Sequence, residues 1–302
     1  MNKRPFSDRV LDRIWTLAGD WMQDTTPPAS ALIPEGDETS ISGTMAWPLA
    51  CQALASGACS SKRFRRRRSV REVVETLAPT DGRHFARWIV ARHPQCLTNP
   101  EFLRLNDWGD PIQAPGFVLG TSRPYSPTAL RHLAHALWLS GHQMVRPGET
   151  VIEIGVGFGG LASMNWHVGQ SPTHPVDLPP VINAARLMLA ETGNVGALAS
   201  EPADGEPYSV ISCYAFSELN RMLQDEYFDR YIRNSRRGMI VSNAAMFSQS
   251  IGGRSDEALV AWFRSQGIPA SATSQCDLLS PADIACKVTL IHWNRDEYQE
   301  PA

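Results

Sequence analysis

A glycine-rich turn is the part of this 302-residue chain whose residue types and spacing are best suited to chemistry. The apolar run 151–154, with Glu153 inside it, leads into Gly155, Gly157 and Gly159 and then into a helical pattern. Glycine is needed where the backbone passes close to a ligand and takes angles that a Cβ would forbid. The start of the following helix offers free N–H groups to a polar or anionic ligand group. The pattern therefore predicts a cofactor-binding turn between a strand and a helix.

A second acid is placed to work with this turn. Asp177 ends the next predicted strand, where an acid hydrogen-bonds the ribose hydroxyls of an adenosine ligand. Gly155, Gly157 and Gly160 also satisfy the dinucleotide pattern G-x-G-x-x-G, so an NAD(P)-linked oxidoreductase is an alternative. Two features favour a methyltransferase. Glu153 stands two residues before the first glycine, which gives E-x-G-x-G-x-G, and the predicted sheet ends in an antiparallel strand. A fold that binds neither cofactor is a third alternative.

The elements that position these residues are predicted from the second half of the chain. Short apolar runs alternate there with helical patterns, which indicates a doubly wound α/β fold with a largely parallel sheet. The link 280–285 is too short for a parallel crossover, so the last two strands should pair antiparallel. The predicted strands are 150–154, 175–178, 196–200, 208–214, 238–243, 270–278 and 286–293, and the predicted helices are 159–167, 180–192, 219–234 and 255–266.

The first half of the chain is predicted to be helical. Apolar spacing indicates helices at 9–22, 44–54, 69–77 and 82–92. Ser126 and Pro127 then open a helix that runs to Ser140, with Ser126 as its N-cap. We therefore expect residues 1–125 to form a helical cap and residues 126–302 to form the cofactor-binding domain. The cap would exclude water and shape the acceptor pocket.

Five segments carry a more specific resemblance. They are 126–131, 153–160, 176–179, 212–218 and 237–243, and they lie in a stretch from about residue 106 to residue 243. Together they resemble a family of sugar O-methyltransferases. The resemblance implies a class I methyltransferase fold with a seven-stranded sheet, S-adenosylmethionine as cofactor, and a sugar or another small-molecule hydroxyl as acceptor.

The resemblance also implies a set of cofactor-binding residues. The glycines would line the turn, Glu153 would contact the methionine amino group and Asp177 would contact the ribose. Leu178 and Tyr214 belong to two of the matched segments and are included on that ground. The full expected set is Glu153, Gly155, Gly157, Gly159, Asp177, Leu178 and Tyr214.

Glu218 is the first candidate for the catalytic base. It follows the fourth predicted strand, at the edge where open α/β sheets bind ligands. A hydroxyl acceptor has a high pKa, so its methylation gains from a base that takes the proton as the new bond forms. The alternative is that Glu218 caps the next helix, because a carboxylate suits a helix N-terminus. His167 is the second candidate, and the other histidines considered are His132, His135, His142 and His174.

The run Lys62–Arg68 is the strongest local charge, and it could contact nucleic acid or the phosphates of an anionic acceptor. A nucleic-acid methyltransferase is therefore another alternative, although the net charge of −3 argues against general affinity for polyanions. We expect a solvated or ion-paired run on the helical cap. No acid cluster follows the fourth predicted strand, so no metal is expected.

The expected partner is a small-molecule acceptor, with no nucleic acid and no membrane, and a homodimer is left open. No apolar run approaches the roughly 20 residues that span a bilayer. The first residues are charged rather than apolar, so a cytoplasmic location is expected.

Overall fold

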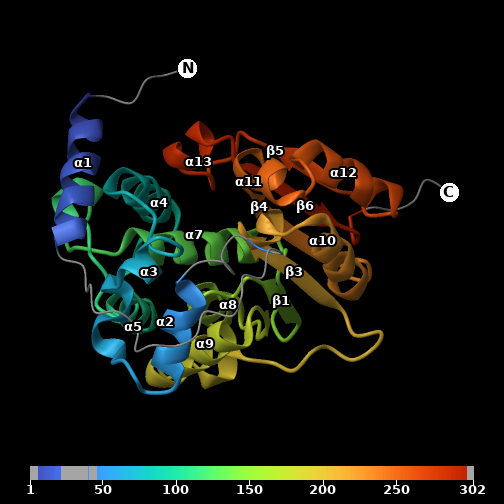
Figure 1. Cartoon of the computed structure of the whole chain (residues 1–302), viewed down its shortest axis with the longest axis horizontal. Coiled ribbons are helices and arrows are strands. Elements are labelled where there is room, and N and C mark those ends of the chain that lie inside the picture. The colour runs from blue at the N-terminus through green and yellow to red at the C-terminus, as the bar shows by residue number, and fades with distance from the viewer. Residues whose placement is uncertain (1–5, 22–39, 41–45, 298–302) are drawn as a thin grey trace.

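The computed structural model describes residues 6–21, 40 and 46–297 (Figure 1). Within these residues, six strands form one sheet in the order β2-β1-β3-β4-β6-β5. Strands β1 to β4 are parallel, and β6 runs antiparallel to both β4 and β5. The strands are β1 (Thr150–Ile154), β2 (Thr173–Val176), β3 (Tyr208–Cys213), β4 (Arg237–Ser242), β5 (Ser271–Thr273) and β6 (Thr289–Asn294).

This sheet confirms the predicted α/β class and the antiparallel final strands, but the seven-stranded expectation is wrong for the described residues. The predicted strand 196–200 is a 3₁₀ turn at Val195–Ala197, followed by a single bridge between Leu198 and Thr173. The segment is built from glycine, alanine and serine around one leucine, so it has few side chains to pack on a sheet face. The sheet therefore ends at β2.

Each face of the sheet packs against its own group of helices. Val151, Ile211 and Met239 belong to the core shared with the helices that precede β1 and follow β1 and β2. Ile152, Val210 and Ile240 belong to the core on the opposite face, which includes Phe263 of α12. The second-half helices are α7 (Pro127–Gly141), α8 (Gly160–Gly169), α9 (Pro179–Glu191), α10 (Arg221–Tyr227), α11 (Ala244–Ile251), α12 (Asp256–Ser265) and α13 (Pro281–Ala285).

The first half of the chain is helical where it is described. Its helices gather on the side of the sheet away from α10 and α12 (Figure 1). The predicted helix 69–77 is shorter than expected and ends after one turn. The first-half helices are α1 (Phe6–Trp21), α2 (Trp47–Ala55), α3 (Arg68–Arg71), α4 (Pro79–Arg92), α5 (Pro100–Asp107) and α6 (Gly116–Leu119). Residues 22, 44 and 45 of the predicted helices lie outside the described residues. No described helix meets the length and apolarity that crossing a membrane requires.

Arg65 joins the first-half helices to the rest of the fold. It is fully buried and its guanidinium donates to the carboxylate of Glu75, to the carbonyls of Leu105 and Trp108, and to Ser126 Oγ. Ser126 is the N-cap of α7, as predicted, and its Oγ accepts from the N–H of Ala129. One cation thus satisfies carbonyls from the first-half helices and anchors the first turn of α7.

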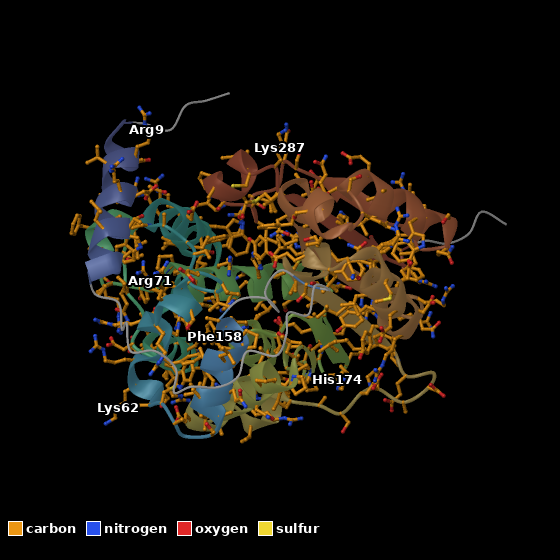
Figure 2. The ribbon with its side chains drawn as sticks, viewed as in Figure 1. Arg9, Lys62, Arg71, Phe158, His174 and Lys287 are labelled. Atoms are coloured by element: carbon orange, nitrogen blue, oxygen red, sulfur yellow. The ribbon has the colours of Figure 1, made fainter. Side chains whose placement is uncertain are left out.

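The other arginines of the run also have partners within the protein. Arg66 donates to the backbone and side chain of Asp110, and Arg68 pairs with Glu72. Lys62 and Arg63 are exposed, and Figure 2 shows Lys62 at the outer edge of the molecule and Phe158 well inside it. Arg65, Arg66 and Arg68 are therefore ion-paired or hydrogen-bonded, and Lys62 and Arg63 are solvated, as expected for this run.

We predict that Arg65→Met costs about 3–5 kcal/mol of unfolding free energy, because it leaves the Glu75 carboxylate without its buried partner. Arg63→Met is the matched control in the same turn, and its cost should stay within about 0.5 kcal/mol because the side chain is exposed. Urea unfolding of both variants measures the difference. Equal stability of the two would contradict the role given to Arg65.

Candidate active site

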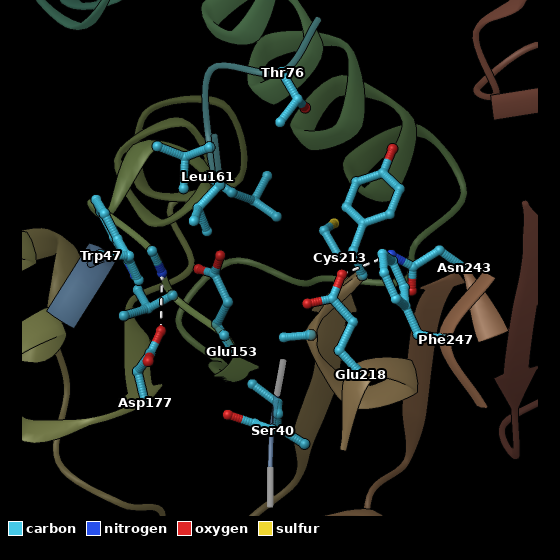
Figure 3. A pocket seen from close by; sticks show the side chains of 18 of the residues that line it. Ser40, Trp47, Thr76, Glu153, Leu161, Asp177, Cys213, Glu218, Asn243 and Phe247 are labelled. Atoms are coloured by element: carbon cyan, nitrogen blue, oxygen red, sulfur yellow. Dashed lines mark hydrogen bonds between the residues drawn. The ribbon is translucent and has the colours of Figure 1, made fainter. Parts of the chain in front are cut away.

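A cavity of about 710 Å³ lies at the carboxyl ends of β1 to β4. The strand order sets the spatial order of the residues along the cavity floor. From one side to the other, these are Asp177 after β2, Gly155 after β1, Glu218 after β3 and Asn243 after β4. Figure 3 shows Asp177 and Glu218 on opposite sides of the cavity, with Glu153 between them. Helices of both halves supply the walls, including Trp47 from α2 and Phe247 from α11.

The backbone conformation of the turn requires glycine. Gly155 has a φ of +83°, and a Cβ there would lie 2.1 Å from the Cβ of Ala215 in the loop after β3. Gly157 has a φ of +55° and lines the cavity. Gly159 is the N-cap of α8 and lies against Ala185 and Met188 of α9, outside the cavity lining. Gly155 and Gly157 therefore line the cavity, whereas Gly159 packs against α9.

Glu153 is buried in β1 and faces the cavity. Its Oε2 atom is buried and has no hydrogen-bond partner among the described residues. Burial, and then the nearby Asp177 carboxyl, raise the pKa of Glu153 well above its usual value. A buried acid without a donor is costly, so this position suits a ligand that brings a cation or a donor.

Asp177 faces the same cavity from the end of β2. Its Oδ2 accepts from the N–H of Gly157 at 3.2 Å, and its Oδ1 accepts from the N–H of Leu178 at 2.8 Å. Desolvation raises the pKa of Asp177 to about 6, although both N–H groups act to lower it. Leu178 lines the cavity next to Asp177. The structure thus brings Glu153, Gly155, Gly157, Asp177 and Leu178 together, as predicted.

Tyr214 lies at the end of β3 with a φ of +73°, a strained angle for a residue with a side chain. Its hydroxyl donates to Oδ1 of Asp283 in α13 at 3.0 Å. The guanidinium of Arg131, in α7, lies 5.1 Å from the centre of the Tyr214 ring. Arg131 is buried and lines the cavity, yet the sequence pattern did not identify it. Arg131 ends the segment 126–131, one of the five on which the sequence resemblance rests, and this was the signal that could have found it.

Glu218 lines the cavity from the 3₁₀ turn Ala215–Glu218, and its Oε1 accepts from Nδ2 of Asn243 at 2.6 Å. Burial raises the pKa of Glu218, and the bond from Asn243 partly opposes this rise. The helix-capping alternative does not hold, because α10 begins at Arg221 and its N-cap, Asn220, accepts from the N–H of Leu223. The Glu218 carboxylate therefore lines the cavity and does not cap α10.

The structure does not bring His167 to the cavity. His167 lies in the last turn of α8, near Glu101 and Arg104, and it is absent from the cavity lining. His132 lines the cavity instead, with its ring 5.5 Å from that of Phe158. Burial, and then Arg131, lower the pKa of His132 well below its usual value, and burial lowers that of His135 to about 3. Both rings are therefore neutral near pH 7.

The chain matches no family model and no curated protein. Solved structures with a partly similar fold include the apo form of the S-adenosylmethionine-dependent methyltransferase SibL, which is 13% identical (TM-score 0.39, 55% of each chain covered). Another is an O-methyltransferase family protein from Burkholderia thailandensis, 14% identical (TM-score 0.38, covering 72% of this chain and 71% of that one). The METTL16 MTase domain is 15% identical (TM-score 0.40, covering 69% and 91%).

This chain spans only 55% of the SibL structure. Identities of 13–15% and TM-scores of 0.38–0.40 leave the function of this chain to be argued from its own residues.

We predict that Gly155→Ala destabilises the protein more than Gly193→Ala. Both glycines have a positive φ, but a Cβ at Gly193 meets no atom within 4 Å, whereas at Gly155 it meets Ala215 at 2.1 Å. Gly193→Ala should cost about 1–2 kcal/mol for the backbone alone, and Gly155→Ala about 1–3 kcal/mol more for the overlap. Chemical denaturation measures both. Equal losses of unfolding free energy in the two variants would contradict the close contact between Gly155 and Ala215.

Proposed function

We propose that this protein is an S-adenosylmethionine-dependent methyltransferase that methylates a hydroxyl of a small molecule. The observation that carries the proposal is the unpartnered Oε2 of Glu153, buried in a cavity that it shares with Asp177 and the turn Gly155–Gly157. A cavity of about 710 Å³ falls within the range of small-molecule sites, which is roughly 300–1,000 Å³.

The residues present fit the groups of this cofactor. The ammonium of its methionine part would pair with Glu153, and the ribose hydroxyls would donate to Asp177. Arg131, a buried cation in the lining, would hold the methionine carboxylate. A dinucleotide fits less well, because its pyrophosphate at the same turn would face the Glu153 carboxylate. This repulsion separates the proposal from the oxidoreductase alternative.

The bound cofactor supplies a methyl group on a sulfonium sulfur, which leaves as a neutral thioether. The chain's own residues supply position and a base. The cavity walls hold the acceptor oxygen in line, which accounts for much of the catalysis in a displacement of this kind. Glu218 takes the proton of the hydroxyl, and its raised pKa makes it a stronger base than an exposed glutamate. Asn243 keeps its carboxylate directed at the cavity.

A small molecule is favoured over a polynucleotide as acceptor. Three of the six cations in the run Lys62–Arg68 (Arg65, Arg66 and Arg68) are bound to groups of the protein itself, which reduces the charge that the run offers to phosphates. The sugar acceptor that the sequence resemblance implied is one member of the proposed class.

We predict that the affinity for S-adenosylhomocysteine rises with pH through about 6, where Asp177 loses its proton. The ribose hydroxyls bind the ionised acid, so affinity should increase about tenfold from pH 5 to pH 7. Asp177→Asn should bind S-adenosylhomocysteine more weakly at pH 7, and its affinity should no longer rise through the titration of residue 177. Any rise that remains would come from Glu153. Calorimetry on both proteins measures it, with NAD and NADP as comparators. Binding of NAD instead would support the oxidoreductase.

We predict that Glu218→Gln lowers kcat by about 10²–10⁴-fold, because it keeps an acceptor for Asn243 but removes the basicity. Affinity for S-adenosylhomocysteine and stability should barely change. Glu226→Gln, on the exposed side of α10, is the control and should keep full turnover. Methyl transfer to a working acceptor measures kcat for all three proteins. A fully active Glu218→Gln variant would end the assignment of Glu218 as the base.

A further inference from the structure

The side of the cavity beyond Glu218 is apolar. Its walls come from α10, from α11 and from the loop ahead of α10. We call this part the apolar slot, and it consists of Leu219, Leu223, Tyr227, Met246 and Phe247. Figure 3 shows Phe247 beside Asn243 and Glu218, at the end of the cavity opposite Asp177 and Trp47. The slot is thus next to the proposed base and away from the proposed cofactor groups.

Few polar atoms of the described residues are available to an acceptor in this slot. Nδ2 of Asn243 donates to Glu218, and its Oδ1 accepts from Ser217 Oγ at 2.6 Å. Among the described residues beside the slot, the other side-chain hydroxyls are those of Tyr227 and of Ser40, which bridges to Leu219. A polyhydroxylated acceptor would therefore lose hydrogen bonds to water that this wall does not replace.

We infer that the acceptor is a phenol, with its aromatic ring in the apolar slot and its hydroxyl at Glu218. The inference rests on the proposed methyltransferase function. An aromatic ring packs well against Phe247, Tyr227 and the thioether of Met246. The ring leaves one polar atom to satisfy, and the carboxylate of Glu218 accepts from it.

The acidity of the hydroxyl supports the same choice. A phenol has a pKa of about 10, as in the tyrosine side chain, and an aliphatic hydroxyl is a far weaker acid. A carboxylate is a weak base, so it assists the loss of a phenolic proton much better than the loss of a sugar proton. A carboxylate acceptor would be repelled by Glu218, and a protonated amine would pair with Glu218 but has no lone pair with which to attack.

The transfer of the methyl group to the phenol needs no reactant besides the cofactor, the phenol and Glu218. The phenolic oxygen forms a bond to the methyl carbon while the bond from that carbon to sulfur breaks. The electron pair of the broken bond stays on sulfur, and the phenolic proton moves to Glu218. The products are an aryl methyl ether and S-adenosylhomocysteine, and Glu218 then returns its proton to solvent.

The test measures binding by calorimetry in two stages on the full chain. The first stage titrates S-adenosylhomocysteine alone. The second titrates small probes into the protein saturated with S-adenosylhomocysteine: 4-ethylphenol, methyl glucoside, benzylamine and benzoate. We expect 4-ethylphenol to bind at least about tenfold more tightly than each of the other probes, which corresponds to about 1.4 kcal/mol.

Matched variants locate the bound ring. Leu223→Asn, in the slot, should lower the affinity for 4-ethylphenol by about tenfold or more and leave the affinity for S-adenosylhomocysteine unchanged. Met222→Asn, one residue earlier on α10 and 66% exposed, should change neither affinity. Phe247→Ser gives the same test from α11 if Leu223→Asn fails to fold.

The two stages separate the possible failures. If S-adenosylhomocysteine does not bind, the proposed function is wrong and the inference falls with it. If it binds but methyl glucoside, benzylamine or benzoate binds as tightly as 4-ethylphenol or more tightly, or no probe binds, only the phenol inference is overturned. Binding of 4-ethylphenol that Leu223→Asn and Phe247→Ser leave unchanged would also overturn it, since the ring would then lie elsewhere.

Discussion

The main constraint on the site is the unfavourable free energy of burying two carboxyl groups, those of Glu153 and Asp177, in one cavity. Neither acid forms an ion pair with a described Lys, Arg or His. Asp177 is partly compensated by two backbone N–H groups, but Oε2 of Glu153 has no described partner. A nonpolar residue would be more stable at a site of this kind, so the two acids fit a binding role better than a structural one. A ligand that brings an ammonium and ribose hydroxyls would remove this cost at both positions, so affinity and specificity would arise from the same two groups.

The first half of the chain contacts the glycine turn through Phe158, which lies between Gly157 and Gly159. The Trp108 ring stacks on the Phe158 ring at 5.9 Å, and the Arg65 guanidinium lies 4.8 Å from the centre of the Phe158 ring. Trp108 and Arg65 both belong to the first half of the chain. The backbone of the glycine turn therefore packs against residues that precede the sheet in the chain. This coupling explains why a run of arginines, which suggests a nucleic-acid surface from its composition alone, contains a fully buried member.

Local signals were enough to predict β1, the N-cap at Ser126 and the acid at Asp177, because each depends on residues close in sequence. Arg131 and His132 reach the cavity through the packing of α7 over the glycine turn, so their own spacing did not single them out, although Arg131 lies in a segment that carries the resemblance and His132 was among the histidines named. Helices α11 and α13 were missed because they have eight and five residues and too little periodicity to detect. Helix α11 contributes Met246 and Phe247 to the wall near Glu218. The cofactor side of the site was therefore predictable except for Arg131, and on the acceptor side only Glu218 was.

The topology explains why the cavity lies between Gly155 and Glu218. The helix after β1 packs on one face of the sheet, since Leu161 of α8 belongs to that core, while the helical segment after β3 packs on the other face through Phe228. Because β1 and β3 are neighbours, their outgoing loops diverge and leave a crevice at their carboxyl ends. The close approach of Gly155 to Ala215 forms the floor of that crevice. A methyl group carried over the glycine turn would therefore meet, across this contact, the strand end that presents Glu218.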